Sequence, residues 1–210
     1  MADNYLEKKM EEYRARTAER PRPTATLYRL LLKNRSHRGY DTHFEVRADQ
    51  LRKIIEVNTC IPSARNQQVL RFRPVLADEA VAVLPHIRLG GALPEQHLPL
   101  PGTEPNAFII VCSTVAEDRY VDIDLGISVQ SMLLRAVEMG LNGICIGAFD
   151  KPKIVEAFDL KEEPLLILAI GKGIERIELT EIGARDSHAY YRENGVHYVP
   201  KLRIEELIIE

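Results

Sequence analysis

The stretch DIDLGISVQSMLLRAVEMGLNGICIGAFDKP, residues 122–152, carries the clearest structural pattern in the sequence. Apolar side chains recur at helical spacing through Ile123, Ile127 and Leu134, which predicts a long helix over residues 122–139. Acidic residues stand at its start, and Gly140 is placed to close it as a C-terminal cap. The apolar run GICIGAF that follows predicts a buried strand, so helix and sheet are expected to pack in layers.

Two further apolar runs, AFIIVC (107–112) and PLLILAIG (164–171), also predict buried strands. LRFRPVL (70–76) partly alternates, as an extended segment does. Asp150-Lys-Pro152 is a good helix start, and KIVEAF continues that helix. Strands alternating with helices predict a layered α/β-type core with a buried sheet.

The N-terminal part of the chain predicts two elements of different kinds. Residues 5–20 mix Glu, Lys and Arg and are expected to form an exposed helix that ends at Pro21. A short helix with Leu27, Leu30 and Leu31 on one face follows it. We therefore expect an N-terminal helical arm over 1–26 and a single domain over 27–210.

Other parts of the sequence predict shorter helices and loops. Residues 48–57 predict an amphipathic helix, and DEAVAVLPHI, beginning at Asp78, predicts a brief one. Residues 89–106 are rich in Gly and Pro and are expected to form a long loop of the kind that covers binding sites. Residues 172–196 are polar and are expected to be irregular.

The charge balance argues against a nucleic acid partner, and the short apolar runs argue against a membrane partner. Lys+Arg number 28 and Asp+Glu 31, a net charge of −3, whereas binding to a phosphate backbone needs a positive excess. The N-terminus lacks the apolar core of a signal peptide, and the longest apolar runs are too short to span a bilayer. The sequence therefore predicts a cytoplasmic protein.

Several chemical motifs are absent from the sequence. Cys60, Cys112 and Cys145 are far apart and show no metal-ligand spacing, so neither a disulfide framework nor a metal site is expected. The GKG at 171–173 lacks the spacing of a phosphate-binding loop, and no GxGxxG or GxSxG occurs. A Rossmann dinucleotide site and a serine hydrolase are thus disfavoured.

Four segments become informative when they are taken together. They are NRSHR (34–38), PSARNQQ (62–68), GLNGICIGAF (140–149) and VPKLR (199–203). Each alone is explained by a charged helix end, a polar turn, a bend or a solvated strand edge. In this order and spacing, over roughly residues 27–210, they resemble the motifs of the nitroreductase family.

The resemblance implies an α+β (α/β layered) fold with a central antiparallel or mixed sheet flanked by helices. It also implies a homodimer with FMN bound at the dimer interface. The FMN phosphate is a dianion, which arginines hold through paired, charge-assisted bonds, and the edge of the flavin ring suits the amides of Asn66 and Gln68. A cation near N1, such as Arg65 or Arg71, would favour the reduced flavin. The implied cofactor-binding residues are Arg35, Ser36, Arg38, Pro62, Ser63, Ala64, Asn66, Gln68, Ile146, Gly147, Ala148, Lys201 and Arg203.

The sequence departs from the family pattern at three places. Asn34 stands at the usual first arginine, which removes one charge from the phosphate site. Val69-Leu70 replaces the Pro-Trp that commonly follows the glutamine loop. Gly147 stands where some members carry glutamate. An alternative explanation for this glycine is that close packing or a bend of the chain requires it. These departures bear on the substrate more than on the cofactor.

The expected activity is an FMN-dependent oxidoreductase that uses NAD(P)H to reduce a nitroaromatic, quinone or similar small-molecule acceptor by ping-pong transfer. The cofactor carries the chemistry, so no catalytic side chain and no metal ligand is expected. The loop 84–106 and the segment 188–198, with Tyr190, Tyr191 and Tyr198, are candidates to line the acceptor pocket. Two alternatives stay open: a flavin-binding or flavin-handling protein without turnover, and an interaction protein acting through residues 1–26.

Overall fold

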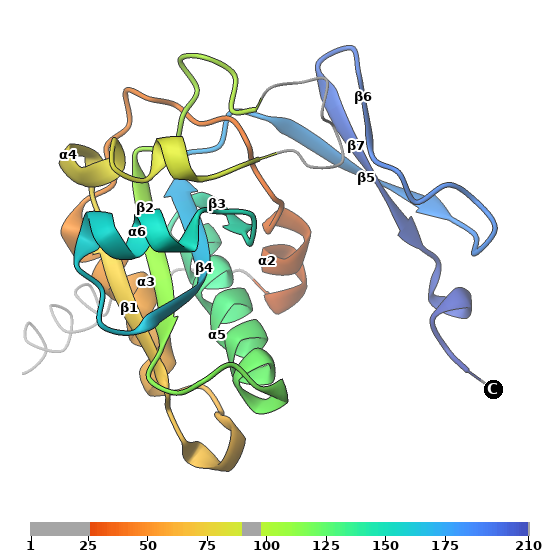
Figure 1. Ribbon diagram of the computed structural model, residues 1–210. Coiled ribbons are helices and arrows are strands. Elements are labelled where there is room, and N and C mark those ends of the chain that lie inside the picture. The colour runs from red at the N-terminus through yellow and green to blue at the C-terminus, as the bar shows by residue number, and fades with distance from the viewer. Residues whose placement is uncertain (1–25, 90–97, 210) are drawn as a thin grey trace, which may run out of the picture.

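The computed structural model describes residues 26–89 and 98–209 and contains a four-stranded antiparallel sheet at its centre (Figure 1). The strands run in the order β1-β2-β4-β3. They are β1 (Leu70–Val75), β2 (Ala107–Ser113), β3 (Asn142–Ile146) and β4 (Glu163–Gly171). Every residue of β2 is buried, as its continuous apolar run predicts, whereas Pro74 lies in the edge strand β1, where a missing N–H is tolerated.

Helices cover both faces of this sheet. Alternate strand residues such as Ile109 and Val111 pack with the buried faces of α3 (Ala48–Ile55) and α5 (Arg119–Glu138). Their neighbours, such as Phe108, pack instead toward α4 (Ala77–Ala80) and α6 (Lys151–Phe158). The predicted layered core and the α+β class with helices on both faces of the sheet are confirmed.

The ends of the two best-predicted helices are set by local side chains. The carboxylate of Asp118 accepts hydrogen bonds from the main-chain N–H groups of Tyr120 and Val121 at the start of α5. Gly140 follows α5 with φ of +79°, the left-handed conformation of a C-terminal cap. Asp150 caps α6 in the same way as Asp118 caps α5, by accepting from Lys153 N–H.

A second sheet corrects the prediction for residues 172–196. These residues are not irregular throughout, because they contain β5 (Arg176–Ile182) and β6 (Tyr191–Glu193). Both pair with β7 (Val196–Leu202), β5 in parallel and β6 antiparallel. We call residues 176–209 the C-terminal arm, because Figure 1 shows this sheet projecting from the body of the molecule.

Smaller differences concern the ends of elements. α2 (Leu27–Lys33) forms as predicted, although it buries no side chain. The helix predicted over 48–57 ends at Ile55 and continues as the 3-10 helix η1 (Glu56–Thr59). The brief helix after Asp78 is shorter than predicted and is followed by the 3-10 helix η3 (Leu84–His86). The strand predicted over 143–149 ends at Ile146.

Two predictions lie wholly or partly outside the described residues: the helix at 5–20 and the central part of the loop at 89–106. The division into an arm over 1–26 and a domain over 27–210 stays a prediction. Within 26–89 and 98–209, no helix is long and apolar enough to cross a bilayer.

Candidate functional site

The NRSHR motif forms a short extended segment beside the edge strand β3. We call residues 34–38 the arginine segment. Ser36 forms an isolated parallel bridge with Gly143, and the main-chain N–H of His37 donates to the carbonyl of Gly143 at 3.3 Å. Asn34 donates from its side chain to Gln130 of α5 at 3.2 Å. The segment is therefore fixed between α5 and the sheet.

Within this segment, two arginine side chains are half-buried. Arg35 donates to the carbonyl of Leu31 at 2.7 Å, and burial lowers the pKa of its guanidinium from the ordinary value. Arg38 donates to the carbonyl of Ser36 at 3.3 Å, and its guanidinium lies 5.2 Å from the centre of the Tyr190 ring. The Nε groups of both arginines are buried and have no partner among the described residues. Buried donors of this kind suit an anion.

Two histidines close to the charged groups of this segment are buried. His37 and His197 are 7% and 3% exposed, and the His197 ring stacks on Tyr190 at 5.1 Å. Burial is the largest cause that lowers the pKa of each imidazole. Arg38 lowers the pKa of both further, Arg192 lowers that of His197, and Glu175 acts in the opposite direction. Both rings are therefore neutral at pH 7.

This burial predicts that stability falls in mild acid. An unfolded histidine takes up a proton near its ordinary pKa of about 6.5, but the buried rings resist it, so protons favour the unfolded state below that pH. The contribution is fully present above about pH 6.5 and is lost as the pH falls, by at most about 1.4 kcal/mol per pH unit for each ring. Urea unfolding at pH 7.5 and at pH 5.5 measures it.

The control for this prediction is an exposed histidine. His197→Gln is expected to show a weaker dependence of the unfolding free energy on pH than the unsubstituted protein. His43→Gln removes an exposed ring and is expected to keep the full dependence. Equal pH dependence in both variants would contradict the assignment.

The second motif, residues 62–68, forms a loop that is held by α5. We call these residues the amide loop. Asp124 is 4% exposed, and its carboxylate accepts from the Ser63 hydroxyl at 2.7 Å and from the Ala64 N–H at 2.6 Å. The Ser63 hydroxyl in turn accepts from the N–H of Gln68 at 3.0 Å. Reasoning from the sequence missed Asp124, because nothing in the helix pattern shows which loop its side chain meets.

The amide loop has an unusual backbone. Arg65, Asn66 and Gln68 all have positive φ, at 52°, 54° and 51°. Residues other than glycine rarely adopt positive φ, because the backbone is strained there. Such backbone strain persists only where the surrounding structure holds the residue in place, and it is most frequent at functional sites. The Gln68 amide donates to the Asn66 side chain at 3.1 Å, so the two predicted amides lie side by side.

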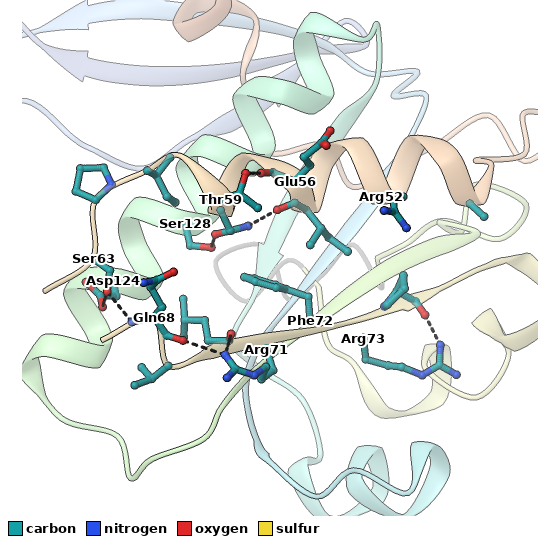
Figure 2. A pocket seen from close by; sticks show the side chains of 18 of the residues that line it. Arg52, Glu56, Thr59, Ser63, Gln68, Arg71, Phe72, Arg73, Asp124 and Ser128 are labelled. Carbon is teal, nitrogen blue, oxygen red and sulfur yellow. Dashed lines mark hydrogen bonds between the residues drawn. The ribbon is translucent and has the colours of Figure 1, made fainter. Parts of the chain in front are cut away.

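The amide loop borders a cavity among the described residues. This cavity measures about 820 Å³ and lies between α3, β1 and the start of α5 (Figure 2). Pro62, Ser63, Gln68 and Phe72 are among the residues that line it. Arg71 turns to donate to the carbonyls of Gln68 and Leu70 at 2.9 and 2.8 Å, whereas Arg65 stacks on Tyr120.

The arginine segment borders a different cavity of about 360 Å³, lined among others by Arg35, His37, Asn142 and Glu175. Val137 near the end of α5 lines this cavity, and Asp124 near the start of α5 lines the other. The two residues are thirteen positions apart on the helix, which corresponds to roughly 20 Å. One chain thus holds its arginine segment and its amide loop at opposite ends of the same helix.

The remaining predicted residues lie elsewhere. Ile146 ends β3, and the exposed Gly147 and Ala148 follow it, with the Ala148 carbonyl accepting from Arg88 N–H. Lys201 and Arg203 are exposed in the last part of the arm, where Arg203 pairs with Glu206 at 3.5 Å. Figure 1 shows this end of β7 directed away from α2 and α5. In one chain the late cations therefore do not join the arginine segment.

No three His, Cys, Asp or Glu side chains come together in a metal-binding arrangement within the part of the chain that the structure describes. None of the three cysteines forms a disulfide.

Comparisons with known proteins agree with the observed fold. A protein of Methanocaldococcus jannaschii, provisionally named a nitroreductase, is 39% identical over 57 residues, which are 27% of this chain and 29% of that protein. A provisionally named nitroreductase from Desulfovibrio desulfuricans, solved in complex with FMN, superposes with a TM-score of 0.60 at 22% identity, over 72% of this chain and 88% of that one.

A further structure, provisionally named an NAD(P)H:FMN oxidoreductase from Staphylococcus epidermidis, has a TM-score of 0.56 at 20% identity, over 70% and 87% of the two chains. At these identities the solved structures establish the fold alone. The family model described as "Nitroreductase family" matches residues 31–172, which include the arginine segment, the amide loop and the whole central sheet. Since this match covers more than half of the sequence, the chain belongs to the nitroreductase family.

Proposed function

We propose that this chain is one subunit of a homodimeric, FMN-dependent oxidoreductase that accepts hydride from NAD(P)H and passes electrons to a small molecule such as a nitroaromatic or a quinone. The observation that carries the proposal is the arginine segment. Its two half-buried guanidinium groups keep buried N–H donors without a partner among the described residues, and these donors suit a phosphate dianion.

A dimer would unite the two halves of the site. If two copies pack with their α5 helices antiparallel across a twofold axis, the arginine end of one helix meets the amide end of the other. Exposed apolar side chains favour such an interface: Leu27, Tyr28 and Leu32 on α2 and Ile123 on α5 are between 46% and 70% exposed. The projecting arm, with Lys201 and Arg203, would then reach the partner subunit.

The residue types fit the rest of the cofactor. Asn66 and Gln68 would hydrogen-bond the C=O and N–H edge of the flavin ring, while the exposed Gly147 leaves its backbone open, with no other atom within 4 Å of a Cβ built there. Bound FMN would supply the two-electron chemistry, so the protein needs only to bind and orient the ring and exclude water. The relatives solved with FMN or named for NAD(P)H support the choice of cofactor and donor.

An absorbance spectrum of the purified protein tests the proposal first. A yellow protein that bleaches with NAD(P)H without air, and is reoxidised by a quinone, supports the oxidoreductase. A yellow protein that NAD(P)H does not bleach points to flavin handling without turnover. A protein that stays colourless and fails to bind added FMN overturns the proposal.

The double variant Arg38→Ala with Arg203→Ala tests the phosphate site. Each charge-assisted bond to phosphate contributes about 1.5–3 kcal/mol, so the variant is expected to bind FMN at least about tenfold more weakly. Fluorescence titration with FMN measures this. Riboflavin lacks the phosphate and is the control ligand, whose affinity is expected to stay unchanged. An unaltered affinity for FMN would show that the phosphate lies elsewhere.

A further inference from the structure

Glu175 is a half-buried residue with a largely covered carboxylate, at the point where the C-terminal arm leaves the body. It lies between β4 and β5, and its side chain is 10% exposed. One carboxylate oxygen, Oε2, accepts from the main-chain N–H groups of Arg38 and Gly39, the latter at 3.1 Å. The other, Oε1, accepts from the guanidinium of Arg192 on β6. One side chain therefore joins three segments.

Other contacts join the same segments. The Ile174 N–H donates to the carbonyl of Gly39 at 3.2 Å, and Tyr40 forms an isolated bridge with Gly173. On the arm side, the ring of Tyr190 lies under the guanidinium of Arg38. Among the described residues, Glu175 is the side chain whose single charged group accepts both from the main chain of the arginine segment and from Arg192 of β6.

We propose that Glu175 is a positioning residue that clamps the arginine segment to the C-terminal arm. The clamp fixes the direction in which Arg38 presents its guanidinium and the angle at which the arm carries Lys201 and Arg203. This inference rests on the proposed FMN-binding function, since its consequence is tighter binding of the cofactor phosphate. The family match ends at Lys172, so neither Glu175 nor Arg192 lies within it.

A simpler role for Glu175 makes the opposite prediction. If the carboxylate acted only through its charge, it would repel the phosphate, and its neutralisation would strengthen FMN binding. Arg192, as a cation, would attract the phosphate, and its loss would weaken binding. As a clamp, the two residues act together, so the loss of either weakens binding.

The substitution Glu175→Gln separates these roles. Glutamine can keep a carbonyl oxygen toward Arg38 and Gly39, but its NH₂ group then faces the Arg192 guanidinium, and the link to the arm is broken. Arg192→Met breaks the same link from the other side. Arg176→Met removes a surface arginine whose partner among the described residues is Glu178, and it is the matched control for the change in charge.

We expect Glu175→Gln and Arg192→Met each to weaken FMN binding by about tenfold, with riboflavin affinity and that of the control unchanged. Stronger FMN binding by Glu175→Gln would overturn the clamp in favour of the charge effect. An equal loss for FMN and riboflavin would overturn it in favour of a general structural role.

Hydrogen exchange in the flavin-free protein gives a readout that needs no cofactor. The amides of residues 188–192 are expected to exchange faster in both variants than in the unsubstituted protein, because the arm is released. Unchanged exchange there would overturn the clamp. Failure of the unsubstituted protein to bind FMN would instead remove the proposed function and leave the exchange result to decide the clamp.

Discussion

Replacing Asp124 with alanine is expected to lower the free energy of unfolding by about 3 kcal/mol and to loosen the amide loop. The substitution leaves the Ala64 N–H without its acceptor and removes the acceptor of the Ser63 hydroxyl, in a site where Asp124 is almost fully buried. Hydrogen bonds to a charged group contribute about 1.5–3 kcal/mol each, and an unpaired buried donor carries a further penalty.

The backbone of the loop adds to this effect. Three residues with positive φ follow the Asp124 contacts, and non-glycine residues in this region are strained by about 1 kcal/mol or more each. Once the carboxylate is gone, the loop can relax to a less strained form that no longer holds Asn66 beside Gln68. We therefore expect faster hydrogen exchange at the amides of Ala64 and Gln68, in addition to easier unfolding by urea.

Asp122→Ala is the control, because Asp122 stands two residues earlier on the same helix and is exposed. Substitutions at exposed positions change stability by about 0.5 kcal/mol or less. Asp124→Asn keeps one oxygen and is expected to fall between the two. If Asp124→Ala unfolds at the same urea concentration as Asp122→Ala, the loop does not depend on α5.

The sequence predicted those features that depend on neighbours in the chain. Gly140 and Asp150 act within one helical turn, and the buried strands β2 and β4 are continuous apolar runs, so both are visible in short windows. The contacts that build the site are different. Asp124 meets Ser63 across 61 positions, and Glu175 meets Arg38 across 137, so only the fold brings them together.

The arm shows a second reason for failure. In β5 the sequence RIELTEI does alternate, but none of its residues is buried, because the strand pairs with β7 away from the central core. A strand with two solvated faces carries the polar composition of a loop. The family resemblance supplied the motifs, whereas their distribution over the two ends of α5 came only from the structure.

Gly173→Ala adds one methyl group beside the arginine segment and is expected to lower the free energy of unfolding by about 3 kcal/mol. The imidazole of His37 packs directly on the Cα of Gly173, and a Cβ there would overlap three atoms of the ring. His37 is 7% exposed, and its main-chain N–H donates a hydrogen bond to the carbonyl of Gly143, so the ring has little room to move. Urea unfolding measures the loss.

A double-mutant cycle shows whether this overlap is the cause. His37→Ala removes the ring and leaves a small cavity, which is destabilising by itself, but it also makes room for the new methyl group. The double variant is therefore expected to be more stable than the sum of the single effects implies, by about 1–3 kcal/mol. Gly147→Ala, whose Cβ would meet nothing within 4 Å, controls for the exchange of glycine for alanine. Strict additivity in the cycle would mean that His37 does not rest on Gly173, and the arginine segment would then be held by Glu175 and Gly143 without this contact.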